Sequence, residues 1–192
     1  MPHSCRNDLL ALIVLACAAP SVSAEEAPLD AGAVRVAVLT GTNAYRASKN
    51  IPELQENAAL QAAATAYAAY LAEHEKMGHT ADGKNPPKRV SAQGYKYCFI
   101  SENVRSSLRH SETMPAEELA RKAMDGWKKS PGHNANLLQK RAHEIGIGAA
   151  GWTLDGQEIF RVVQVFASAC PQKRQSNPWI VRTLAGTVDT SR

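Results

Sequence analysis

The chain has 192 residues, of which 44% are hydrophobic and 21% charged, and its formal net charge at pH 7 is +4. This length and composition fit one globular domain that buries enough apolar surface to fold without a structural metal. The positive charges are scattered and include no dense basic run with interleaved aromatic residues, which argues against a nucleic acid as the partner.

The first 24 residues have the pattern of a secretion signal. A short polar start containing Arg6 precedes the apolar run 9–19, and small residues lead to Ala24, after which we expect cleavage. The apolar run is shorter than the roughly 20 residues of a membrane-spanning helix. The sequence therefore predicts an exported protein, periplasmic or extracellular, without a transmembrane segment. One alternative stays open, in which Cys17 carries a lipid anchor.

Two helices and a long loop are expected next. Residues 31–46 have a helical pattern, and Asn57 is a good N-cap for an alanine-rich helix that extends to His74. The alanines of this second helix would let another element pack very closely against it. Residues 78–95 are rich in Gly, Pro and Asp, which predicts an irregular loop.

The second half of the chain is expected to contain most of the strands. Residues 96–104 alternate as in a short strand, and a third helix begins near Pro115 and ends at the Ser-Pro-Gly break of residues 130–132. Two strand-like runs within 144–167 predict an antiparallel hairpin that turns at Asp155. Helices that cluster early and strands that cluster late indicate an α+β domain.

The domain is expected to cover residues 31–170, followed by a polar tail at 171–192. Removal of the leader leaves two cysteines, Cys98 and Cys170. In an oxidising compartment an even pair predicts one disulfide. Two buried free thiols are the alternative.

Three polar residues fall at the edges of the expected elements. His79 begins the long loop, Glu102 lies near the end of the short strand, and His133 follows the break after the third helix. Two neutral imidazoles and one carboxylate can form an open site for zinc or another divalent cation, and Glu102 is also the candidate catalytic residue. The spacing matches no local metal motif, so ordinary hydrogen-bonding roles stay open.

A set of motifs links these residues. NAYRA occupies 43–47, GHT follows the alanine-rich helix at 78–80, SENV occupies 101–104, WKKSPGHNANLL occupies 127–138, and EIGIGAA occupies 144–150. The motifs occur in the order found in the CAP superfamily, which comprises cysteine-rich secretory proteins, antigen 5 and plant pathogenesis-related class 1 proteins. Over residues 34–167 the chain resembles the short bacterial branch of this superfamily.

The resemblance implies a three-layer α-β-α sandwich with a central antiparallel sheet. It also implies a cleft in which His79 of GHT and His133 of PGH match a histidine pair, and Glu102 of SENV matches a cleft glutamate. Ser130 stands near the position where many relatives have a second glutamate. This departure weakens a mechanism with two carboxylates more than it weakens a metal site.

The leading hypothesis is an exported binding module whose His79, His133 and Glu102 cluster holds Zn or another divalent cation. Its partner would be a lipid, a cell-wall component or a protein. Two alternatives stay open. One is metal-assisted hydrolysis that uses the same three residues, and the other is a purely structural cluster with function at a surface contact.

Overall fold

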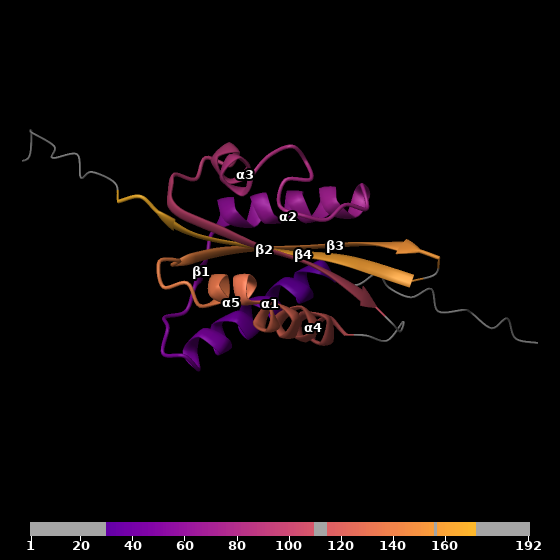
Figure 1. Cartoon of the computed structure of the whole chain (residues 1–192). Helices are drawn as coiled ribbons and strands as arrows, with labels where there is room; N and C mark the ends of the chain where they lie inside the picture. The colour runs from indigo at the N-terminus through magenta and orange to yellow at the C-terminus, as the bar shows by residue number, and fades with distance from the viewer. Residues whose placement is uncertain (1–29, 110–114, 156, 172–192) are drawn as a thin grey trace, which may run out of the picture.

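The computed structural model describes residues 30–109, 115–155 and 157–171, and these residues form a three-layer sandwich. The sheet lies in the middle (Figure 1), with α2 (Ala58–Glu73) and α3 (Pro86–Ala92) on one face. The other face is covered by α1 (Ala31–Ala47), α4 (Ala116–Lys129) and α5 (Pro131–Leu137). The predicted α-β-α fold class is therefore confirmed. The expected leader with Cys17, and nearly all of the expected tail, lie outside the described residues.

The sheet has the strand order β1-β3-β4-β2, so β2 is an edge strand. The long strands β2 (Tyr97–Arg109), β3 (Glu144–Leu154) and β4 (Gln157–Ala169) pair antiparallel, as predicted. The two-residue strand β1 (Gln55–Glu56), which we did not predict, pairs parallel to β3. Strand β4 therefore lies between β2 and β3 and pairs with both.

The helix caps explain where the main helices begin. The Asp30 side chain accepts a hydrogen bond from the amide of Gly32 at the start of α1, and the Asn57 side chain accepts from Ala59 and Leu60 at the start of α2. Helix α4 begins after Pro115 with two glutamates in its first turn, where negative charge is favoured by the helix dipole. These helices agree with the predicted ranges to within a few residues.

The predictions were wrong or too short at three places. Residues 86–92 of the expected loop form α3, because Asn85 caps the helix and two prolines occupy its first turn, where they cost no hydrogen bond. Of the expected Ser-Pro-Gly break, only Ser130 lies between two helices. Helix α5 already starts at Pro131, so that His133 lies on a helix. Strand β2 extends five residues beyond Val104, because β4 pairs with it as far as Arg109.

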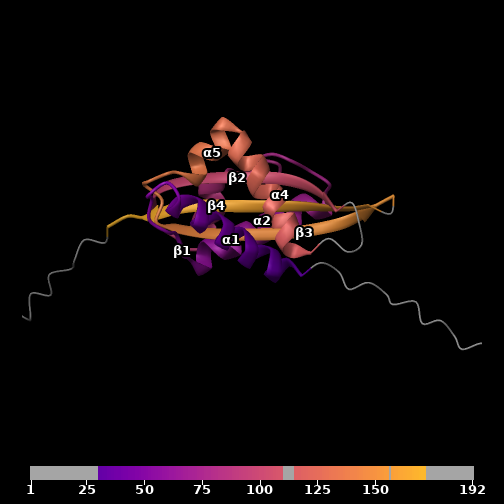
Figure 2. The same cartoon turned by 90° about the horizontal axis from the view of Figure 1, so that it is seen from below.

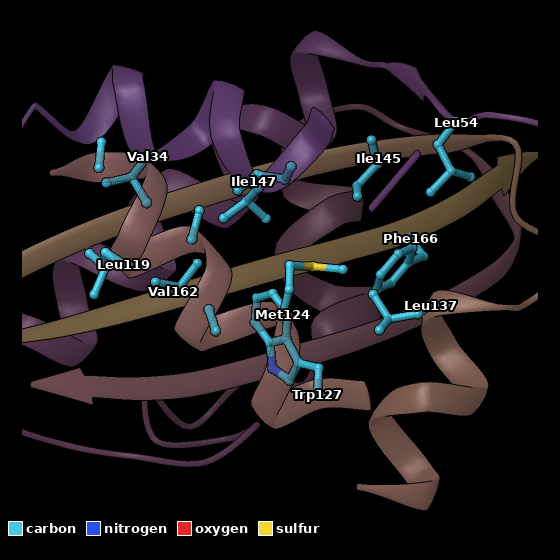
Figure 3. Packing of buried hydrophobic residues seen from close by; sticks show 14 of the residues in the cluster. Val34, Leu54, Leu119, Met124, Trp127, Leu137, Ile145, Ile147, Val162 and Phe166 are labelled. Carbon is cyan, nitrogen blue, oxygen red and sulfur yellow. The ribbon is translucent and has the colours of Figure 1, made fainter. Parts of the chain in front are cut away.

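Two apolar cores lie on opposite faces of the sheet. Figure 3 shows the core beneath α1, α4 and α5, where Met124, Trp127 and Leu137 pack toward Phe166 of β4. The second core lies beneath α2 and α3 and contains Leu60, Ala64, Tyr67, Leu71, Val90, Val104, Val163 and Val165. Since β4 contributes to both cores, it is buried on both faces. No helix in the described ranges is long and apolar enough to cross a membrane.

The predicted disulfide is present and joins Cys98, at the start of β2, to Cys170, just beyond β4. Its two Cα atoms lie 4.7 Å apart, within the range that a disulfide requires. The alternative of two free thiols is therefore wrong. The covalent bond joins the same two strands that pair along the edge of the sheet.

Close packing of α2 on β3 depends on two glycines. A Cβ atom on Gly146 would overlap the backbone of Leu60, and a Cβ on Gly148 would overlap the backbone of Ala64. The expectation that the alanine-rich helix packs very closely is thus confirmed. The backbone of α2 touches the strand itself, with no side chain between them.

We expect Gly148→Ala to lower the free energy of unfolding by about 1–3 kcal/mol, because the added methyl group meets a backbone carbonyl that cannot move alone. Urea unfolding followed by circular dichroism measures the change. Gly132→Ala is the matched control, since no atom lies within 4 Å of the position of its added Cβ. A Gly148→Ala variant as stable as Gly132→Ala would contradict the close approach.

Candidate cleft at the edge of β2

The candidate site is built around Glu102, whose side chain lies at the free edge of the sheet on the α2 and α3 face. Glu102 pairs with Val165 of β4, which belongs to the core under α2. His79 comes from the segment after α2, and Arg89 comes from α3. His133 comes from α5 on the other face of the sheet. The candidate site residues therefore reach the edge strand from both helical layers.

Both carboxylate oxygens of Glu102 are engaged. Oε1 lies 2.9 Å from Nδ1 of His79, and Oε2 accepts a hydrogen bond from Nη2 of Arg89 at 2.7 Å. The side chain is only 1% exposed. Burial raises the pKa of Glu102, while the charge of Arg89 and its hydrogen bond, together with His79, act in the opposite direction. The predicted contact between His79 and Glu102 is thus present.

Arg89 is the main organising residue that sequence reasoning missed. Its guanidinium forms ion pairs with Asp82 at 2.9 Å and with Glu102, and it donates to the backbone carbonyls of Lys84 and His79. Its guanidinium carbon lies 3.4 Å from the ring centroid of Tyr67. Only a planar guanidinium can donate to all of these acceptors and also stack on the tyrosine ring, so lysine could not replace arginine here. No local motif marks Arg89, because its partners become neighbours only when α3 forms.

Tyr67 fixes the segment that carries His79. Its hydroxyl donates to the carbonyl of Gly78 at 2.6 Å and accepts from the amide of Ala81 at 3.2 Å. The two bonds flank His79 in the sequence, so the backbone on either side of the imidazole is tied to α2. The His79 side chain itself is 49% exposed and is therefore open to a ligand.

His133 occupies a different environment from His79. It is half-buried, and burial lowers its pKa, with the charges of His79 and Arg105 acting in the same direction. Its backbone carbonyl accepts from Nδ2 of Asn103, while Asn136, one turn along α5, donates to the carbonyl of Glu102. These bonds dock α5, the helix that carries His133, on β2.

The NAYRA motif has a structural role, which Asn43 and Arg46 perform. Asn43 exchanges two hydrogen bonds with the backbone of Leu54. Arg46 is buried and donates to the carbonyls of Pro52, Leu137, Gln139 and Ala142. These bonds tie the segment after α5 to α1 and so support the helix that carries His133.

The residues present fit a metal only in part. In the ranges 30–109, 115–155 and 157–171, no three His, Cys, Asp or Glu side chains are arranged to hold a metal ion. Both carboxylate oxygens of Glu102 already have hydrogen-bond partners. Because a carboxylate oxygen can only accept, Nδ1 of His79 is the donor in their hydrogen bond. The contacts make Glu102 a residue that orients an imidazole, a common arrangement behind metal-binding histidines. Zinc binding by His79 and His133 stays a prediction.

We expect Arg89→Met to lower the free energy of unfolding by about 3–5 kcal/mol, because Glu102 would stay buried without its cation. Urea unfolding measures this loss. In the Arg89→Met, Glu102→Gln double variant the uncompensated charge is gone, and part of the stability should return. Arg141→Met is the control, since it removes an exposed cation that lies over the Phe99 ring. Equal stability of the two single variants would contradict a structural role for the Arg89 contacts.

Comparison with known families matches residues 39–166 to the cysteine-rich secretory protein family (CAP). The match spans most of the described structure, including His79, Glu102 and His133. No curated protein matches the chain.

Solved structures share the fold at low identity. An outer surface protein from Borrelia burgdorferi is 21% identical with a TM-score of 0.60, and the match covers 74% of this chain and 97% of that one. An extracellular SCP-domain protein from Bacillus anthracis is 18% identical with a TM-score of 0.57 over 73% of this chain. A Staphylococcus aureus cysteine-rich secretory protein is 17% identical with a TM-score of 0.53 over 72%. The chain covers only 44% and 39% of the last two proteins.

Proposed function

The chain belongs to the cysteine-rich secretory protein (CAP) family, and from this premise we propose that it is an exported binding protein whose cleft holds a divalent cation between His79 and His133. Zinc is the first candidate because imidazole nitrogens suit it. Glu102 then acts as the residue that orients His79. The remaining coordination positions would be open to water or to the bound partner.

One observation carries this proposal, namely the hydrogen bond between Nδ1 of His79 and Oε1 of Glu102. When the N–H group of Nδ1 donates this hydrogen bond to the carboxylate, the lone pair of Nε2 is available to a metal. The side chain is half exposed, so this nitrogen is accessible. Arg89 holds the other carboxylate oxygen, so that the acceptor for His79 stays in place.

The state of His133 also supports cation binding. An imidazole must be neutral to bind a metal, and the pKa of His133 is lowered by burial first and also by the nearby guanidinium of Arg105. The neutral form is therefore favoured at pH 7.

The geometry favours binding over metal-assisted hydrolysis. A general base needs a carboxylate oxygen within reach of the proton that it accepts. Both oxygens of Glu102 are already occupied, and the side chain is buried. Ser130, near the place of the second glutamate in many relatives, brings no additional carboxylate. A purely structural role for the cluster is the outcome to be tested against binding.

Export and surface recognition form part of the same proposal. The secretion pattern of residues 1–24 supports export to the periplasm or the cell exterior. The similar Borrelia structure is that of an outer surface protein, and the similar Bacillus structure is that of an extracellular protein. The partner of this chain is a lipid, a cell-wall component or a protein.

Calorimetric titration of the metal-stripped protein with zinc tests the cation site. We expect saturable binding in the wild type and none in the His79→Ala, His133→Ala double variant. Glu102→Gln should weaken binding by about 10–100-fold, because the partner that orients His79 becomes a poorer acceptor.

The control for the zinc titration is His143→Ala, which removes an exposed imidazole outside the cleft and should leave the affinity unchanged. No binding by the wild type would overturn the proposal. A His79→Ala variant that loses stability but keeps every binding activity would instead establish the structural role.

A further inference from the structure

A cavity lies on the opposite face of β2 from Glu102. It has a volume of about 650 Å³ and opens between β2 and α4. Figure 2 shows the sheet from the side on which α4 lies. Four cationic side chains line the cavity, together with the carboxylate of Asp125. The cationic residues are Arg105, Arg121, Lys122 and Lys129. Nothing in the proposed cation site uses this cavity.

Arg105 forms its floor. Arg105 pairs with Val162 of β4, whose side chain belongs to the core under α1 and α4, so it points to the α4 face. Its guanidinium lies against the backbone of Gly126, where an added Cβ would overlap the guanidinium carbon. A residue with any side chain at position 126 would therefore push Arg105 out of this place.

The hydrogen-bonding capacity of Arg105 is not used up. Its Nε is buried and has no hydrogen-bond partner among the described residues. No ion pair of the guanidinium is present among the described residues either, so its positive charge is not compensated within this part of the chain. Arg105 therefore favours a ligand that carries oxygen acceptors.

The carboxylates near the cavity are already paired with other cations. Asp125 accepts from Nη1 of Arg121 at 3.0 Å, and Glu118 lies 3.4 Å from Nζ of Lys122. Neither Arg105 nor Lys129 forms an ion pair within the part of the chain that the structure describes. Positive charge therefore exceeds negative charge at the cavity, and two of its cations are available to an anion.

From these observations we propose that the cavity between β2 and α4 is a phosphate-binding site, with Arg105 as its central ligand and Lys129 beside it. The planar guanidinium donates two parallel hydrogen bonds to phosphate oxygens, and the lysine adds a flexible point charge. A cavity of this volume exceeds the needs of a bare ion and has room for a phosphate carried on an organic group. The site does not depend on a metal in the cleft.

Calorimetric titration with inorganic phosphate, and separately with glycerol phosphate, tests the site at constant ionic strength in chloride. The first probe reports a free ion and the second a phosphate ester. We expect saturable binding of either probe by the wild type and a loss of at least about tenfold in Arg105→Gln, since hydrogen bonds between charged groups are the stronger class.

Gly126→Ala gives a test that leaves the net charge unchanged. The added methyl group displaces the flexible end of Arg105, while alanine favours the helix, so affinity should fall about tenfold without a loss of thermal stability. Lys140→Gln removes an exposed charge that does not line the cavity and should bind like the wild type. Absence of saturable binding, equal affinity in all variants, or full affinity in Gly126→Ala would overturn the assignment.

Discussion

A buried carboxylate is costly unless a cation and hydrogen bonds compensate it, and Glu102 imposes this constraint on the whole cleft. Arg89 supplies the cation at 2.7 Å, and it can do so only because α3 brings it over the edge of β2. The same guanidinium binds Asp82 and two backbone carbonyls of the preceding segment. The arginine that compensates the Glu102 carboxylate therefore also holds the segment that carries His79.

The edge position of β2 gives its two faces different chemistry. Glu102 points toward α2 and α3, whereas Asn103 bonds to His133 and Gln164 on the other face, and Arg105 lies against α4. Alternation along a strand separates these side chains although they are close in sequence. Because no strand covers the free edge among the described residues, helices and connecting segments from both layers can bring polar groups to it.

Sequence patterns predicted the elements whose signals are local. The Asn57 cap, the start of α4 after Pro115 and the β3–β4 hairpin all depend on neighbouring residues, and each was found. Helix α3 was missed because Pro86 and Pro87 read as loop residues, although prolines fit a first helical turn. The resemblance gave the contact of His79 with Glu102. It did not give Arg89, whose role depends on contacts that form only when α3 is present.

The position of α2 connects the apolar packing to the polar cleft. Gly146 and Gly148 let the helix backbone lie directly on β3, which sets the height of Tyr67 above the sheet. At that height the tyrosine ring lies against Arg89, and its hydroxyl reaches the backbone of Gly78 and Ala81. Because protein interiors are close-packed, a shift of α2 would also move the side chains that pack on it. Two glycines that touch no cleft residue therefore help to determine where the imidazole of His79 lies.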